Sequence, residues 1–242
     1  KTVYIPKRTT PPGVDFFGFP TPEKTLYPVN LELVKKFYTV TDDPAKADFA
    51  MVFIKSPVSN GYSKADREAG GNGYVPISLQ LKDYTAVDAR AQSIAAGDPV
   101  VDPTITNRSY LNKTSKSNSY PDLNTILDTK KAMNGKPVLV AVTVSNPMVF
   151  GEFEKEVDAI VGEFGVQTEA LLDIVSGQVE PSGLLPLQMP KDMTTVEKQL
   201  EDVPHDMIPY QDANGNVYDF GFGLNWKGVI KDARTEKYSI KK

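Results

Sequence analysis

The sequence predicts an α/β protein built on a mostly parallel sheet. Residues 138–144 read VLVAVTV, an almost unbroken apolar run rich in β-branched residues. Such a run is typical of a strand that is covered on both faces. Ala50–Ile54 (AMVFI) is a second run of the same kind. Helical patterns lie between and after these runs with few linking residues, and this alternation of strand and helix is the signature of the α/β class.

The first elements are expected in the order strand, arm, helix. Val3–Ile5 is a candidate strand, and the Pro-rich arm Pro6–Pro28 that follows it has little helical prospect and should run over the surface. Asn30 can then cap a short helix. Asp42-Asp43-Pro44 is a turn that leads into the strand Ala50–Ile54, and a parallel return of this kind implies a right-handed crossover.

The middle of the chain is expected to be mostly irregular. Several glycines keep Pro57–Tyr84 out of regular structure, and a helix is predicted over Tyr84–Ala96. Gly97–Tyr120 reads as a polar loop. Asp122 is expected to cap a helix that continues to Met133.

The last part of the sheet is predicted from a second, shorter apolar run over 157–161. Thr168 can cap the following helix, whose apolar side chains share one face, and Gly177 can end it because glycine accepts a left-handed conformation. A Gly-Pro-rich exit then leads into a short strand. At 217–224 aromatic residues alternate with glycine, which predicts a strand or turn packed closely against another segment.

We expect residues 1–242 to form a single domain with a long loop at about 56–83 and a loose tail from about 228. The composition, with 40% hydrophobic and 24% charged residues, excludes disorder for the chain as a whole. A net charge of −4 without a basic stripe gives no indication of a nucleic-acid partner. No apolar run reaches the roughly 20 residues of a membrane span.

Several kinds of site are excluded or disfavoured by the residue types present. The sequence has no cysteine, which excludes disulfides, thiolate nucleophiles and cysteine-bound metals. His205 is its one histidine, so a two-histidine metal site is excluded as well. The glycines at 70–73 are not followed by the Lys-Ser/Thr of a phosphate-binding loop. We therefore expect neither a metal nor a cofactor.

Four segments carry a resemblance to a known family. Residues 180–190, EPSGLLPLQMP, resemble the "NPSGRLPVTFP"-like segment of family 3 glycoside hydrolases. Residues 158–161 (DAIV) and 170–177 (ALLDIVSG) look like the "ADAIL" and "A-DVL-G" elements of that family, and 218–224 (YDFGFGL) is similar to its "YPFGYGL". The segments keep the family's order and spacing, whereas residues before 136 match only in outline.

The resemblance is to the second domain of these enzymes, an α/β sandwich that follows a (β/α)8-type barrel. Together with strands covered on both faces, it implies a three-layer sandwich with a mostly parallel sheet between helices. It also implies an exo-acting, retaining β-glucosidase- or β-xylosidase-like hydrolase whose substrate is an oligo- or aryl-β-glycoside. Such chemistry uses two carboxyl groups roughly 5–5.5 Å apart.

In this family the nucleophilic aspartate belongs to the barrel and the acid/base to a loop of the second domain. The resemblance therefore implies a barrel domain as the partner, and it implies that this chain holds at most one of the two carboxylates and is inactive alone. The chain begins at Lys1 directly with a strand, which suggests the interior of a longer polypeptide. A periplasmic or secreted location is favoured over the cytoplasm.

The resemblance places the acid/base in the loop after Ala50–Ile54. Glu68 is the one glutamate of residues 59–74, and glycines follow it, so it is the first candidate. A general acid must keep its proton near neutral pH, and burial under a facing barrel would raise its pKa as required. Asp66 is the alternative, and Arg67 is a candidate substrate-binding residue.

Asn72 is a second candidate substrate-binding residue.

The loop departs from the family's pattern in one respect. An Asp-Arg pair normally follows the family's glutamate, whereas here Asp66-Arg67 precedes Glu68, which puts Ser63 at the matching position. The competing interpretation of these charged residues is a solvated loop tip with weak local ion pairs.

Two other functions remain open from the sequence. The first is a non-catalytic structural or carbohydrate-binding α/β domain, in which Trp226 and Tyr218 could stack on sugar rings, although packing is the commoner role of such residues. The second is a flavodoxin-like nucleotide binder. No glycine-rich turn follows Ile5 or Ile54, so nothing beyond the order of elements favours it.

Overall fold

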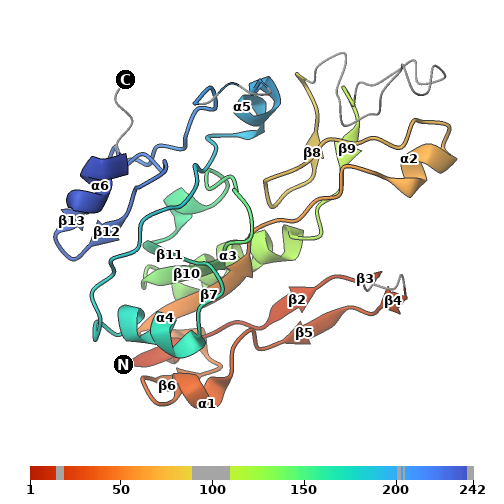
Figure 1. The fold of residues 1–242 in the computed structure, drawn as a ribbon. Coiled ribbons are helices and arrows are strands. Elements are labelled where there is room, and N and C mark those ends of the chain that lie inside the picture. The colour runs from red at the N-terminus through yellow and green to blue at the C-terminus, as the bar shows by residue number, and fades with distance from the viewer. Residues whose placement is uncertain (15–18, 89–109, 201–202, 204, 239–242) are drawn as a thin grey trace.

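A five-stranded, all-parallel sheet forms the centre of the computed structural model, which describes residues 1–14, 19–88, 110–200, 203 and 205–238 (Figure 1). The strand order is β11-β10-β7-β1-β6. The strands are β1 (Thr2–Tyr4), β6 (Thr39–Thr41), β7 (Phe49–Lys55), β10 (Val138–Thr143) and β11 (Ala159–Glu163). The predicted parallel sheet is confirmed, because every neighbouring pair runs in the same direction.

Helices cover both faces of this sheet. Successive side chains of a strand point to opposite faces, so Val52 packs into one apolar core while Met51 packs into another. The core around Val52 includes buried residues of α3 (Tyr120–Met133), and the core around Met51 includes residues of α1 (Leu31–Val34) and α4 (Thr168–Val175). The three-layer α/β sandwich is therefore confirmed.

The helix ends agree only in part with the predictions. The Asn30 side chain accepts a hydrogen bond from a first-turn amide at 2.9 Å, as expected of a cap, and Gly177 ends α4 with a φ of +81°. The other two predicted caps are wrong. Asp122 lies inside α3, which begins after Ser119, and Thr168 is the first residue of α4 and not its cap.

The Pro-rich arm is a β-hairpin, which the sequence did not predict. Strand β2 (Arg8–Thr10) pairs antiparallel with β5 (Lys24–Leu26), and β3 (Gly13–Val14) pairs with β4 (Pro20–Thr21) further out. Figure 1 shows the hairpin extending away from the sheet alongside α3.

The loop 56–83 contains a short helix, α2 (Lys64–Glu68), although no regular structure was expected there. After the loop, β8 (Tyr84–Thr85) pairs antiparallel with β9 (Thr114–Ser115). The predicted helix over Tyr84–Ala96 is wrong for its described residues, which begin with this strand; the rest of it lies outside the described residues. The predicted polar loop 97–120 also lies outside them up to residue 109.

The C-terminal part contains α5 (Met193–Lys198), β12 (Leu224–Asn225), β13 (Gly228–Val229) and α6 (Ala233–Tyr238). The expected strand after the Gly-Pro-rich exit is reduced to an isolated bridge between Pro190 and Pro209. The stretch from about 228, expected to be loose, carries β13 and α6, and the Arg234 guanidinium donates a hydrogen bond to the Ser182 carbonyl at 2.8 Å. In the described part of the chain, no helix is long and apolar enough to cross a membrane.

The Gly-Pro-rich exit and the glycine–aromatic segment pack directly against each other. The Leu185 amide donates to the Phe222 carbonyl at 2.7 Å, and the Gly221 amide donates back to the Leu185 carbonyl at 2.8 Å. A Cβ at Gly223 would lie only 2.1 Å from the Gly183 carbonyl oxygen, so the contact requires glycine. The predicted close packing of 217–224 is confirmed.

Candidate functional site

The loop 56–83 starts from the carboxyl end of β7 and is held at both ends by the segment after β10. At its start, the Ser56 hydroxyl donates to the Asn146 side-chain oxygen at 3.2 Å and accepts from the Ser145 amide at 2.9 Å. At its end, the Glu152 carboxylate accepts hydrogen bonds from the Leu81 and Lys82 amides. Burial raises the pKa of Glu152. The loop therefore leaves the sheet from a fixed base.

Residues 61–75, which we call the knob, form a closed unit at the far part of this loop. The Val75 amide donates to the Gly61 carbonyl at 3.0 Å, and the Ser63 amide donates to the Gly73 carbonyl at 2.7 Å. The Ser63 side chain caps α2, because its hydroxyl accepts a hydrogen bond from an amide of the helix at 3.2 Å. Figure 1 shows α2 at an outer end of the molecule.

Asp66 lies on the inner side of the knob. Its carboxylate accepts hydrogen bonds from the Gly73 amide and from the Lys113 ammonium, both at 2.8 Å. The neighbouring Lys113 holds the pKa of Asp66 below its usual range. The contact is close enough that a Cβ at Gly71 would lie 2.2 Å from the carboxylate. An ionised carboxylate with these partners suits a structural role better than that of a proton donor.

Glu68 has the opposite environment. It is the last residue of α2, its side chain is 65% exposed, and it contacts the Lys64 ammonium at 3.5 Å. The Glu68 side chain is therefore largely open to solvent, in contrast to that of Asp66. Arg67, beside it, is also exposed.

Asn72 is engaged within the knob. Its side-chain oxygen accepts hydrogen bonds from the Tyr74 amide, at 3.0 Å, and from the Lys113 ammonium. The structure thus brings Asp66 and Asn72 together around Lys113, and it leaves Arg67 and Glu68 on the outside. Sequence reasoning missed Lys113, which is 47 positions from Asp66 in the chain.

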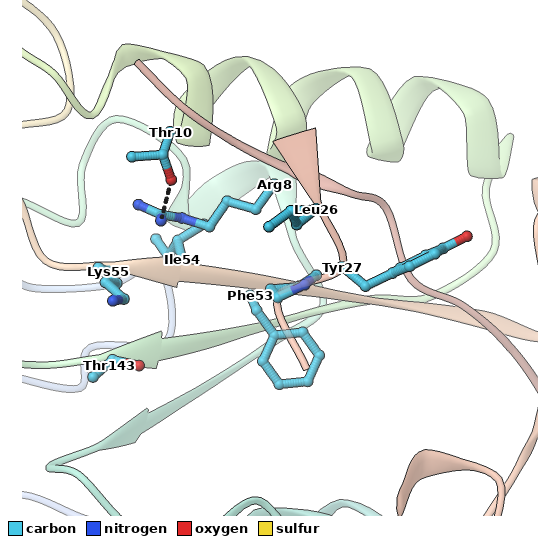
Figure 2. Close-up of a pocket in the computed structure, with 9 residues that line it drawn as sticks. Arg8, Thr10, Leu26, Tyr27, Phe53, Ile54, Lys55 and Thr143 are labelled. Atoms are coloured by element: carbon cyan, nitrogen blue, oxygen red, sulfur yellow. Dashed lines mark hydrogen bonds between the residues drawn. The ribbon is translucent and has the colours of Figure 1, made fainter. Parts of the chain in front are cut away.

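A small cavity of about 190 Å³ lies at the carboxyl ends of β7 and β10, beneath the hairpin (Figure 2). It is lined by Arg8, Thr10, Leu26, Tyr27, Pro28, Phe53, Ile54, Lys55 and Thr143. The strand order reverses between β1 and β7, and ligands of open α/β sheets bind beside such a reversal. The loop 56–83 leaves the sheet from the same edge.

The charge of Arg8 in this cavity is already neutralised. Its guanidinium binds both carboxylate oxygens of Asp122, at 2.8 and 2.9 Å, and Asp122 is only 1% exposed. Burial raises the pKa of Asp122, against the opposing effect of Arg8. The pair fastens the hairpin to α3, and sequence reasoning missed it because the expected cap role of Asp122 was local.

Other residues weighed from the sequence have packing or surface positions. Tyr218 stacks on Phe222, with ring centroids 5.2 Å apart, which is a packing role, while Trp226 is 60% exposed. His205 is exposed. Among the described residues, no group of three His, Asp or Glu side chains is placed to hold a metal ion.

The fold and the knob define a class of protein: a three-layer α/β domain that presents a carboxylate outward on a loop at the carboxyl edge of its sheet. Comparison with known families makes this specific. Residues 32–226 match the family described as "Glycosyl hydrolase family 3 C-terminal domain". The chain therefore belongs to glycosyl hydrolase family 3, as its C-terminal domain, and the resemblance seen in the sequence is confirmed.

Curated relatives that the chain matches are named as β-glucosidases. The chain is 35% identical over 104 residues to "Probable beta-glucosidase C" of Aspergillus flavus, a match that covers 41% of this chain and 16% of the relative. It is 28% identical over 107 residues to "Periplasmic beta-glucosidase/beta-xylosidase" of Dickeya chrysanthemi, covering 44% of this chain and 15% of the relative. The match thus spans about a sixth of the length of these relatives.

A solved structure, of β-glucosidase D2-BGL from Chaetomella raphigera, is also similar. The match has a TM-score of 0.42 and 19% sequence identity, and it covers 78% of this chain and 24% of that one.

Proposed function

We propose that the chain is the second domain of a retaining, exo-acting β-glycosidase that hydrolyses O-glycosidic bonds. In this proposal a (β/α)8 barrel of the same enzyme supplies the nucleophile, and the knob supplies the acid/base. The substrate is an oligo- or aryl-β-glycoside. Family membership and the names of the relatives support this reaction class.

The observation that carries the assignment of the acid/base is the contrast between the two carboxylates of the knob. Asp66 is ionised and bound on the inside, whereas Glu68 stands at the exposed end of α2. A carboxyl that is exposed in the single domain can be buried by a facing barrel, and burial would raise its pKa toward the value that a general acid needs. Glu68 then protonates the leaving oxygen and later activates water, while Arg67 and Asn72 contact the sugar from the same knob.

We also propose a periplasmic or secreted location. The relatives from Dickeya chrysanthemi and Salmonella typhimurium are both named as periplasmic enzymes.

The test uses the full-length protein and aryl β-glucosides. Glu68→Ala should lower kcat by about 10²–10⁴-fold, the usual worth of a positioned acid/base. With a good leaving group, added azide should restore turnover and give a β-glycosyl azide, because azide attacks the glycosyl-enzyme without needing a base. Glu68→Ala with normal turnover, or without azide rescue, would remove Glu68 as the acid/base.

A matched control exists in α1, which is a separate element from the knob. Glu32 in α1 is also exposed (77%) and also pairs with a lysine on its own helix, Lys35, at 2.6 Å. Glu32→Ala should leave turnover unchanged, which separates the loss of a carboxylate at the site from the loss of a surface ion pair.

The second candidate is a non-catalytic structural or carbohydrate-binding domain. The exposed Trp226 favours it, since an aromatic ring open to solvent can stack on a sugar. Binding of soluble β-glucans that is lost in Trp226→Ala, together with full-length protein that is inactive on all aryl β-glycosides, would support this candidate over the first.

A further inference from the structure

We propose that Lys113 is a positioning residue that sets the orientation of the knob and hence of its outward carboxylate. The inference rests on the proposed function, because that function makes Glu68 the group to be positioned. Lys113 itself faces the inner side of the knob and is not a catalytic residue.

The first observation is that one ammonium group joins both branches of the knob. Lys113 Nζ donates to Asp66 Oδ2 at 2.8 Å and to Asn72 Oδ1. Asp66 belongs to the helix α2, and Asn72 belongs to the irregular segment that follows the helix. An ammonium has three donors, so it can hold two acceptors at once and cross-link the two branches.

The second observation is that Lys113 is itself held by a different part of the fold. Its carbonyl accepts from the Ala86 amide at 3.0 Å, and its amide donates to the Tyr110 carbonyl at 3.0 Å. Ala86 is fully buried, and Ser115 in β9 is only 3% exposed. Lys113 thus extends from the fixed β8–β9 ribbon to the knob.

The residue before Lys113 has an uncommon backbone conformation. Asn112 adopts a φ of +65°, and its amide donates to the Ala86 carbonyl at 2.9 Å. A non-glycine residue in this region costs on the order of 1 kcal/mol or more, and such residues persist where the surroundings enforce them. The turn directs the chain so that the next side chain meets the knob.

The solvent exposure of the contact supports an orienting role. The side chains of Lys113 and Asp66 are 19% and 22% exposed, so the ion pair is shielded on most sides. The backbone bonds of the knob close it without Lys113, so loss of the ammonium would leave the knob formed and release its attachment to the ribbon.

The chemistry makes orientation matter. The two carboxyl groups of a retaining glycosidase must lie roughly 5–5.5 Å apart, and a misplacement of about 1 Å can cost 10²-fold in rate. The contact that Lys113 makes at the inner side of the knob can therefore affect turnover, although Lys113 does not touch the substrate.

The test compares Lys113→Met with Lys113→Arg in the full-length protein. Lys113→Met should lower kcat by about 10–100-fold with little change in KM, and the loss should be larger for aryl glycosides with poor leaving groups, which depend on a well-placed acid. Lys113→Arg keeps the charge and donors and should restore much of the activity. Hydrogen exchange of the Gly73 amide, which donates to Asp66, should accelerate in Lys113→Met while overall helicity stays unchanged.

Lys116→Met is the matched control. Lys116 lies next to the same ribbon and also pairs with an aspartate, Asp83, at 2.8 Å, but its side chain is 81% exposed. Neither kcat nor exchange at Gly73 should change in this variant.

The outcomes separate the two proposals. Wild-type kinetics and unchanged Gly73 exchange in Lys113→Met, together with an inactive Glu68→Ala, would overturn the role of Lys113 and leave the proposed function intact. Fully active Glu68→Ala would overturn the assignment of the acid/base. Whether Lys113 orients the knob would then be decided by the hydrogen exchange of the Gly73 amide alone. If Lys113→Met does not fold, Lys113→Gln removes the ammonium while keeping a polar side chain and should give the same leaving-group dependence; the absence of that dependence would count against the positioning role of Lys113.

Discussion

The hairpin arm and the knob differ in how they are attached to the same edge of the sheet. The arm follows β1 and the loop with the knob follows β7, which are neighbouring strands. Each is fastened by a basic residue paired with an aspartate. Asp122, which holds the arm through Arg8, is 1% exposed, whereas Asp66, which holds the knob through Lys113, is 22% exposed. The arm is thus fastened to the fold through a buried carboxylate, whereas the knob is attached through a partly exposed one, and an exposed attachment of this kind is compatible with the proposed contact between the knob and a partner domain.

The largest effect is expected at the arm. Asp122→Ala leaves the Arg8 guanidinium without its buried carboxylate and should destabilise the protein by about 3–5 kcal/mol. Urea unfolding, followed by circular dichroism, measures the change. Replacing both partners in Arg8→Met with Asp122→Leu should cost less than Asp122→Ala alone. A loss below about 1 kcal/mol for Asp122→Ala would show that the arm is held no more firmly than the knob.

A smaller, local effect is expected in the knob from Gly71→Ala. The added methyl would lie 2.2 Å from the Asp66 carboxylate, which cannot move without breaking its bonds to Gly73 and Lys113. We expect a loss of about 1–3 kcal/mol, with faster hydrogen exchange confined to the knob. Gly61→Ala is the control, since its methyl would be 3.7 Å from the nearest atom. Equal effects of the two substitutions would contradict the tight fit at Asp66.

The smallest effect is an opposite pH dependence of the two attachments. Lys113 lowers the pKa of Asp66, so this carboxylate stabilises the fold above about pH 4, its unfolded value, and the contribution is lost as pH falls through the lower folded pKa. Burial raises the pKa of Asp122, so its contribution is present below about pH 4 and is lost as pH rises through the higher folded pKa.

Denaturant unfolding between pH 2 and 8 of Asp66→Asn and Asp122→Asn tests this prediction. Asp66→Asn should remove part of the decline in stability at acid pH, and Asp122→Asn should remove part of the decline above about pH 4. For the partly exposed Asp66 the change should stay below about 1 kcal/mol because solvent screens the pair. Curves that shift in the same direction would contradict the assigned environments.

The same contrast explains which parts of the structure the sequence could predict. The central strands were predictable because runs such as 138–144 carry their own signal in consecutive apolar residues. The cap at Asn30 and the stop at Gly177 were predictable because they depend on neighbours in the chain. Strands β2 and β5 were not, because they are three residues long, mostly polar or exposed, and defined by pairing with each other.

The site was predicted less completely than the fold. The loop and its candidate carboxylates were proposed from a family resemblance, and the residues that give these carboxylates different environments are distant in the chain. Arg8 is 114 positions from Asp122, and Lys113 is 47 positions from Asp66. Asp122 satisfied the local pattern of a helix cap, and only the folded structure shows that its partner is the arm.

The contact between Gly183 and Gly223 has an evolutionary consequence. A Cβ at Gly183 would meet nothing within 4 Å, whereas a side chain at Gly223 would collide with the Gly183 carbonyl, so selection for a folded domain alone is enough to retain Gly223 and the packing of the two segments. These segments are among those by which the family is recognised, yet they lie outside the knob. If the proposed assignment of the acid/base to the knob is correct, a descendant could lose that carboxylate and still carry the family signature unchanged. Genome surveys that count members by this signature would then count folded domains, and working hydrolases would have to be identified by the residues of the knob.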